Sequence, residues 1–399
     1  MRTLLITMLS AFILGVGAFA LAGRGDGGEP VAASSATPQL PPLPPPNAST
    51  AVRLKALRAV VRDAPKVADG WTLLAGAELQ RVRETGDASA YAIAERAVER
   101  ALSLRPGDQA ALTQRAALEL SRHDFRAGLR DARAAHAVDP TVLAPYGPLV
   151  DASVELGHYA AAERYAQAMV DQKPDLAALS RVSYLRELRG DRDGALDALR
   201  AALSAGGQVP ESTAFVSALV GGLELQRGDV AAARRAERMA LHVLPGYGPA
   251  AAGLAKADAA QGKLKASIAR LRGLVERLPL PEHVTLLVET ELAAGETRVA
   301  RRDLALVRAE RALQRSAGVV VDTEAAVFEA DHGSPPQAVA LARRAWRAAP
   351  SVRSADALGW ALTRAGRPDE GLTWARRALS RGWADPAARL HAGIAAAQA

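Results

Sequence analysis

The chain has 399 residues, which is enough for several ordinary domains or for one long array of repeats. Hydrophobic residues make up 49% of it but aromatic residues only 4%, so its core must consist mainly of Ala, Leu and Val. Ala and Leu have high helix propensity, and this composition therefore favours closely packed helices. The absence of cysteine excludes disulfides, thiol catalysis and cysteine-ligated metal or haem.

The formal net charge of +7 is small for this length. Basic residues alternate with acidic ones along expected helices, as in Glu95-Arg96 and Glu99-Arg100. Such alternation is typical of solvated helix faces with i,i+3 and i,i+4 pairs. A nucleic-acid surface would instead show a basic run or stripe with interleaved aromatic residues. The sequence contains no such run, and we expect no nucleic-acid partner.

The N-terminus carries an uncharged apolar run over residues 4–22, directly after Arg2 and Thr3. Two A-x-A patterns, at residues 18–20 and 20–22, match the end of a secretory signal peptide. The same run is close to the about 20 residues that a membrane-spanning helix needs. Residues 1–22 are therefore a cleaved signal peptide or a retained membrane anchor. Both alternatives predict an extracytoplasmic location (periplasmic, cell-envelope or secreted) for the remainder.

Residues 23–50 are rich in Gly and Pro and include the run PQLPPLPPPNAST. Proline has a fixed φ and no backbone donor, so this segment is expected to be a disordered, extended linker. Helical patterning begins after it. We expect an N-terminal capping helix within residues 51–68 and a repeat array over residues 69–399.

Two regular markers divide the array into units. One marker is a proline, and consecutive examples lie 34 to 36 residues apart, with one double gap of 71 residues; they are Pro106, Pro140, Pro174, Pro210, Pro245, Pro279, Pro350 and Pro386. The other marker is a glycine 33 to 38 residues from the next; the series is Gly157, Gly190, Gly228, Gly262, Gly295, Gly333 and Gly366. His123 takes the glycine position in one unit. The two series predict a helix, a turn at the glycine, and a second helix that ends before the proline.

The units place small residues at regular positions. In one unit the small positions hold Ala116, Gly128 and Ala135, a large position of the first helix holds Leu112, and Pro140 closes the second helix. The chain thereby resembles the tetratricopeptide repeat family, whose period is 34 residues. A departure is the large aromatic position of the second helix, which here holds Ala132, Ala166, Leu199 and Ala342. The resemblance implies an all-α fold, a right-handed α-solenoid of about nine helical hairpins.

In that family, ligands generally contact the first helices of the hairpins on the concave face. Carried over by position, the resemblance implies a protein-binding groove formed by Asp151, Tyr184, Lys256, Glu289, Asp356 and Trp360. For Tyr184 and Trp360 a place in the core is an open alternative. The Lys/Asn set with which some family members grip a terminal carboxylate is absent. An acidic C-terminal peptide is therefore not the expected ligand.

One weak cluster of possible catalytic or metal-binding residues occurs in the sequence. No nucleophile elbow, phosphate loop or paired-histidine metal motif occurs. Residues 322–332 contain acidic side chains and His332, which suggest a cation site or acid–base chemistry. The structural interpretation is stronger, because Asp322 suits a helix N-cap and the helix separates Asp322 from His332 by roughly 10–15 Å. We expect no catalytic, cofactor or metal site.

The sequence therefore favours a non-catalytic protein-binding scaffold or assembly adaptor that acts outside the cytoplasm. Its expected partner is a protein or peptide, and it meets a membrane only through the N-terminal segment. The alternative is a metal- or solute-handling accessory protein, or a hydrolase, with its site near residues 322–332.

Overall fold

The computed structural model describes residues 40–45, 47–207 and 209–399. All regular secondary structure in these residues is helical. The helices are α1 (Thr50–Asp63), α2 (Ala68–Thr85), α3 (Ser89–Leu104), α4 (Gln109–Ser121), α5 (Phe125–Val138), α6 (Tyr146–Glu155), α7 (Tyr159–Gln172), α8 (Leu176–Glu187), α9 (Arg192–Ala205), α10 (Pro210–Gln226), α11 (Val230–Val243), α12 (Gly248–Ala260), α13 (Leu264–Arg277), α14 (Pro281–Ala293), α15 (Thr297–Ser316), α16 (Asp322–His332), α17 (Pro335–Ala348), α18 (Val352–Arg364), α19 (Pro368–Leu379) and α20 (Pro386–Gln398).

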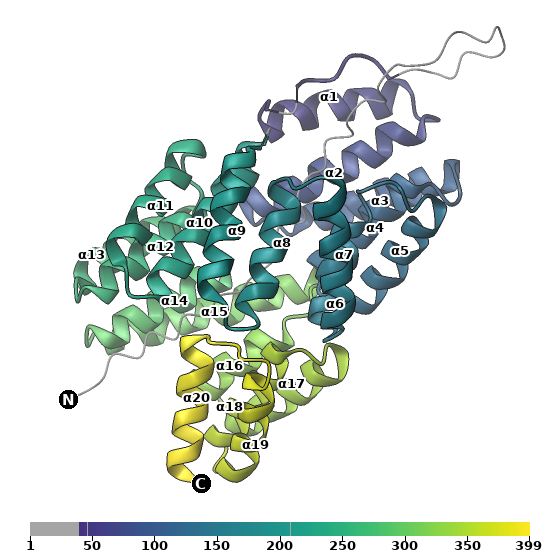
Figure 1. Cartoon of the computed structure of the whole chain (residues 1–399). Helices are drawn as coiled ribbons and strands as arrows, with labels where there is room; N and C mark the ends of the chain where they lie inside the picture. Colours follow the sequence, from purple (N-terminus) through teal and green to yellow (C-terminus); the bar gives the residue numbers. More distant parts are fainter. Residues whose placement is uncertain (1–39, 46, 208) are drawn as a thin grey trace, which may run out of the picture.

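Helices α2 to α19 form nine consecutive hairpins (Figure 1). Each hairpin packs closely on the next, except that α14–α15 and α16–α17 meet mainly through the side chains of Val284, Val307 and Phe328. The single helices α1 and α20 cover the two ends of this stack. The structure thus confirms the all-α solenoid. The signal or anchor expected in residues 1–22 lies outside the described residues, as does most of the linker. In the described part of the chain, no helix is both long and apolar enough to span a membrane.

The hairpins follow from local sequence. Side chains of Asp124, Asp191 and Asp229 each accept a hydrogen bond from a backbone N–H in the first turn of a second helix. Such caps satisfy donors that the helix itself leaves free. The turn before the second helix has a positive φ in eight of the nine hairpins, and glycine adopts this φ without strain. His123 adopts the same conformation, with φ of 63°. This φ confirms the prediction that His123 occupies the glycine position. The exception to the positive φ is the turn before α17, where Gly333 has φ of −139°.

Small residues let the two helices of a hairpin approach closely. In α18 and α19, a Cβ built on Gly359 would lie 2.9 Å from the backbone N of Ala375. A Cβ built on Gly371 would lie 2.8 Å from the carbonyl oxygen of Gly359. No larger side chain fits at such separations, so the small positions of the repeat are a requirement of packing.

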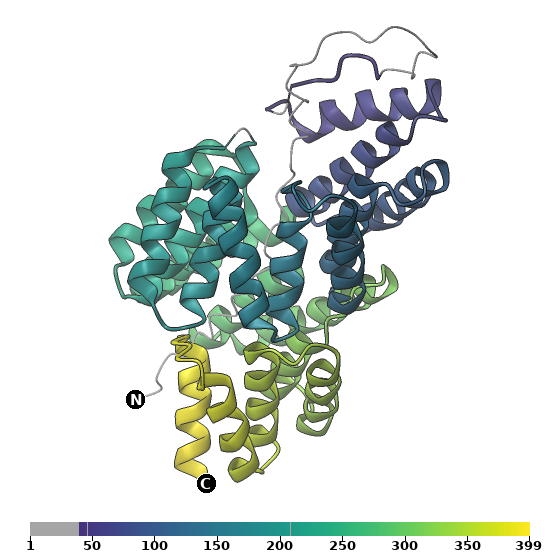
Figure 2. The same cartoon turned by 45° about the vertical axis from the view of Figure 1, so that its right-hand side comes forward.

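The solenoid curls back on itself, so that turns of early hairpins contact loops between late ones (Figures 1 and 2). Four such contacts, which we call the seam, follow one another. The pairs are Gly86 with Leu280, His123 with Val320, Gly157 with Pro350, and Gly190 with Gly382. The turns within hairpins one to four thus contact the loops that follow hairpins six to nine, in the same order.

Hydrogen bonds hold the seam together. The backbone N of Val320 donates to the carbonyl of Arg122 at 2.9 Å, and Nδ1 of His123 lies 2.8 Å from the carbonyl of Val320. The hydroxyl of Tyr159 accepts from the backbone N of Val352 at 2.8 Å. Because each contact joins segments far apart in the chain, the seam converts an open curved array into a closed one.

Candidate ligand-binding cavity

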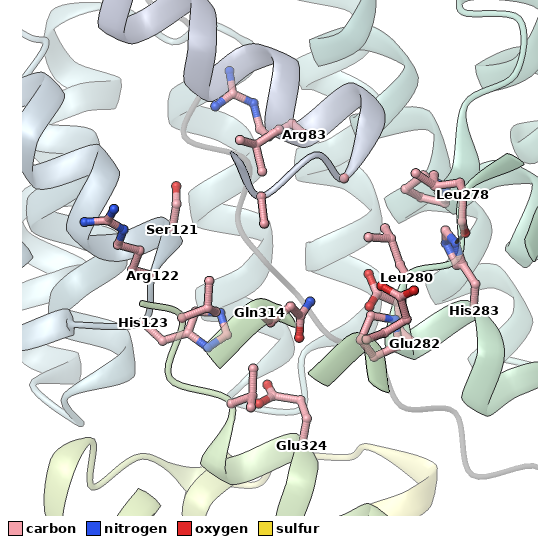
Figure 3. A pocket seen from close by; sticks show the side chains of 18 of the residues that line it. Arg83, Ser121, Arg122, His123, Leu278, Leu280, Glu282, His283, Gln314 and Glu324 are labelled. Atoms are coloured by element: carbon pink, nitrogen blue, oxygen red, sulfur yellow. Dashed lines mark hydrogen bonds between the residues drawn. The ribbon is translucent and has the colours of Figure 1, made fainter. Parts of the chain in front are cut away.

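Closure of the solenoid turns its concave face into a central cavity of 1220 Å³. The lining comes mainly from first helices of the hairpins, with contributions from seam loops. Figure 3 shows side chains from these separate segments around the open space, among them Arg122 and His123 on one side and Leu280 and Glu282 on the other. Cavities for small ligands usually measure about 300–1,000 Å³, so this one suits a longer ligand.

Three of the six residues carried over from the family line the cavity: Asp151, Lys256 and Glu289. Asp151 is already paired, because Arg181 donates two hydrogen bonds to its carboxylate at 2.7 and 2.9 Å. Both side chains are almost fully buried. Their ion pair joins α6 to α8 and forms part of the wall, since separating two buried charges would be costly.

The other three residues lie in the core and do not line the cavity. Tyr184 is 3% exposed and belongs to the apolar cluster that joins α8 to the C-terminal hairpins. Trp360 stacks on His391 at 4.3 Å, and Nδ1 of His391 lies 3.1 Å from both carboxylate oxygens of Asp356. These contacts dock α20 on α18, which gives Asp356 and Trp360 a structural role.

The acidic and histidine cluster near residues 322–332 is dispersed. Asp322 pairs with Arg344 at 2.9 Å, and Asp331 accepts a hydrogen bond from Trp360 at 2.9 Å. Asp322 is the first residue of α16, whose N-cap is Val321, so the expected N-cap assignment was wrong by one residue. Within residues 40–45, 47–207 and 209–399, no group of three or more His, Asp or Glu is placed to hold a metal ion.

The cavity lining is acidic although the whole chain is basic. Ten Asp and Glu side chains line it, against five Arg and Lys side chains. Four of the cations are engaged by the protein; they are Arg83, Arg122, Arg311 and Arg353. Four of the acidic side chains are also paired; they are Asp87, Glu95, Asp151 and Glu211. The other carboxylates leave the lining acidic, and a low-dielectric cavity focuses their field on any molecule that enters.

Lys256 on α12 is the fifth cation. No hydrogen bond or ion pair of its amine occurs among the described residues. Burial lowers the pKa of Lys256, and the nearby carboxylates of Glu237 and Glu289 oppose that shift. The amine is therefore held close to carboxylates without being bound to one of them.

Glu237 is one of the cavity residues that positional transfer from the family missed. It lies on α11, a second helix, and among the described residues of α6 to α14 it is the one second-helix residue in the lining. The sequence does contain a pattern that could have identified Glu237. Glu237 stands eight residues before Pro245, the position at which Ala132, Ala166 and Ala342 stand before their own prolines. A carboxylate at an apolar position predicts a special role.

Apolar side chains complete the lining. They come from several segments and include Leu79, Phe215, Leu219, Leu280 and Val319. Apolar walls with a few convergent charged groups are the usual composition of ligand-binding sites. The arrangement can therefore bury the aliphatic part of a ligand while pairing its charges.

Comparisons with known proteins support the fold. No family model and no curated protein matches the chain. Among solved structures, the human IFIT1 dimer with PPP-AAAA matches with a TM-score of 0.52 and 16% identity, over 83% of this chain and 79% of IFIT1. A tetratricopeptide repeat protein from Parabacteroides merdae matches with a TM-score of 0.43 and 16% identity, over 61% of this chain and 96% of that one.

PilW, a type IV pilus biogenesis factor, matches with a TM-score of 0.43 and 16% identity, over 50% of this chain and 92% of PilW. Identities this low concern the fold alone. The regular period and the nine hairpins make the chain an α-solenoid of helical hairpins, and the match to IFIT1 agrees with this fold.

Proposed function

We propose that the chain is a non-catalytic scaffold or assembly adaptor that holds a segment of a partner protein in its central cavity. The central cavity itself is the observation that supports this function most directly. Its volume of 1220 Å³ exceeds what a typical small-molecule ligand fills. An extended polypeptide segment, with about 3.3–3.6 Å of length per residue, can contact several of the helices that line the cavity.

The composition of the lining favours a peptide over a nucleic acid. Nucleic-acid binding depends on cations that neutralise phosphates. The cavity offers twice as many carboxylates as cations, and most of those cations already have partners within the protein. The repulsion of phosphates by this surface disfavours RNA and DNA as ligands.

The setting of this function is outside the cytoplasm. Support comes from the sequence, in which residues 4–22 are apolar and uncharged and a Pro-rich segment follows. The metal or hydrolase alternative has no comparable support. Its key residues are engaged in structural contacts, as Asp322 is with Arg344 and Asp331 with Trp360.

Recovery of partners by the full chain from envelope extracts of its native host tests the function. The variant Gly222→Trp fills the cavity, because Gly222 lines it and has open space around its Cβ position. The control variant is Gly273→Trp, at an exposed position on α13 with equally open surroundings. We expect Gly222→Trp to lose partner polypeptides that Gly273→Trp retains. Equal recovery by both variants would contradict binding in the cavity.

A further inference from the structure

Glu237 reaches the cavity by an unusual path. Its helix, α11, lies behind the first helices α10 and α12, and its side chain passes between them at two glycines. A Cβ built on Gly221 of α10 would lie 2.3 Å from Oε1 of Glu237, and one built on Gly253 of α12 would lie 2.0 Å from the same atom. Any other residue at either position would obstruct the carboxylate, so the two glycines form a passage for it.

The carboxylate at the end of this passage has no partner of its own. Glu237 is 3% exposed, and its Oε2 is buried without a hydrogen-bond partner. No ion pair with Lys256 forms, although Lys256 projects from the next turn of α12 beyond Gly253. Burial raises the pKa of Glu237 well above its usual range, and the charge of Lys256 only partly opposes that shift. An unsatisfied buried carboxyl group is unfavourable, and a ligand that brings a positive charge would stabilise its ionised form.

The surroundings specify the charge of that ligand. Glu289 and Glu282 line the same cavity near Lys256, and their charges act on its amine together with that of Glu237. Against the effect of burial, the charges of four carboxylates, Glu237, Glu289, Asp385 and Glu282, thus raise the pKa of this one cation. The local excess of negative charge selects a ligand that brings positive charge.

We propose that the cavity takes an extended cationic peptide segment, and that a Lys or Arg side chain of this segment pairs with Glu237 between α10 and α12. The apolar wall contributed by Phe215, Leu219 and Leu280 accommodates the aliphatic stem of such a side chain. This inference rests on the proposed function and names the chemistry of its partner. An entering ammonium or guanidinium supplies the hydrogen bonds that Glu237 lacks.

The test measures binding of three labelled peptides of about eight residues to the full chain, at about 0.15 M salt to limit surface attraction. The peptides alternate Ala with Lys, with Glu or with Gln. We expect the Lys peptide to bind most tightly and Glu237→Gln to weaken its binding at least tenfold. The matched control is Glu276→Gln, which removes an exposed carboxylate from the neighbouring second helix α13 and should leave the affinity unchanged.

A second variant protects the test against loss of folding. Lys256→Met removes the competing cation from the cavity and should tighten binding of the Lys peptide, which a misfolded protein would not do. Unchanged Lys-peptide affinity in Glu237→Gln, or tighter binding of the Glu peptide, would overturn the inference and leave peptide binding in the cavity standing. Binding of none of the peptides, or of spermine more tightly than the Lys peptide, would also overturn it. The partner recovery with Gly222→Trp then decides the proposed function separately.

Discussion

Gly221 and Gly253 leave the space that the side chain of Glu237 fills. An alanine in place of a helical glycine normally stabilises a protein by roughly 0.5–1 kcal/mol. At Gly221 the added methyl would meet Oε1, Cδ and Cγ of Glu237 within 2.9 Å, and such overpacking typically costs about 1–3 kcal/mol. We expect Gly221→Ala to lower the midpoint of thermal unfolding in the natural sequence and to raise it in a Glu237→Ala background.

Gly222 provides the control for that experiment. It is the adjacent residue on α10 and has open space at its Cβ position, so Gly222→Ala should raise the midpoint in both backgrounds. A Gly221→Ala effect of the same sign with and without Glu237 would show that the two glycines are not a passage for the carboxylate.

Glu187 gives the fold a defined pH dependence. Burial raises the pKa of Glu187 to about 7, despite the nearby positive charge of Arg353. The unfolded chain has an ordinary Glu pKa of about 4.3. Between these values the folded state binds a proton that the unfolded state does not, so stability falls as pH rises through this window.

Glu187→Gln removes the titrating carboxyl group, so the free energy of unfolding should fall less as the pH rises. Urea unfolding at intervals between pH 5 and pH 7.5 measures the difference, which is at most about 1.4 kcal/mol per pH unit for one group. The variant should be the more stable protein at pH 7.5. Parallel pH profiles of the variant and the natural protein would show that Glu187 is ionised throughout.

At the residue scale, repeat position indicates where a side chain lies but not what it contacts. Lys256 and Glu289 line the cavity, and their contact with a partner stays a prediction. Asp356 and Trp360 lie away from the cavity, because α20 packs over them and His391 engages both; for Trp360 the core was already an open alternative. The period therefore predicts which residue takes each repeat position. It does not predict which residues that side chain contacts, because those near the end of the array also depend on the packing of the last helix.

At the scale of helices, the proline and glycine series predicted the hairpins and their turns. A helix ends where proline removes a donor and a turn needs positive φ, and both are local effects. The seam was not predictable in this way, because it joins turns and loops 192 to 197 residues apart with no shared pattern. The seam contacts form only if the small rotations between successive hairpins add up, over five hairpins, to bring the turn and the loop together.

The seam glycines provide a test of closure. Gly157 and Gly190 have positive φ, and a Cβ on either would lie within 2.4 Å of a carbonyl oxygen across the seam. Gly262 and Gly366 have similar φ and open surroundings. Alanine at the first two positions should lower the midpoint of thermal unfolding more than alanine at the last two, because only the seam pair adds a steric clash to backbone strain. Equal losses at all four positions would contradict a closed solenoid in solution.

At the scale of the whole molecule, the apolar run of residues 4–22 predicts export of everything after it. Residues 1–50 fused to an alkaline phosphatase without its own signal should give active enzyme, because that enzyme needs disulfides that form outside the cytoplasm. Leu14→Arg places a charge within the run and should abolish the activity. Equal activity of both fusions would show that the run is not an export signal.

The central claim is that a partner polypeptide occupies the cavity enclosed by the solenoid. A photo-crosslinking amino acid at Gly222 or Ala252, both in the lining, tests it directly in living cells. The account predicts crosslinks to a basic segment of another protein from these two positions and none from Gly273 on the outer surface of α13. Crosslinks from Gly273 alone would place the binding surface on the outside of the solenoid and contradict the account.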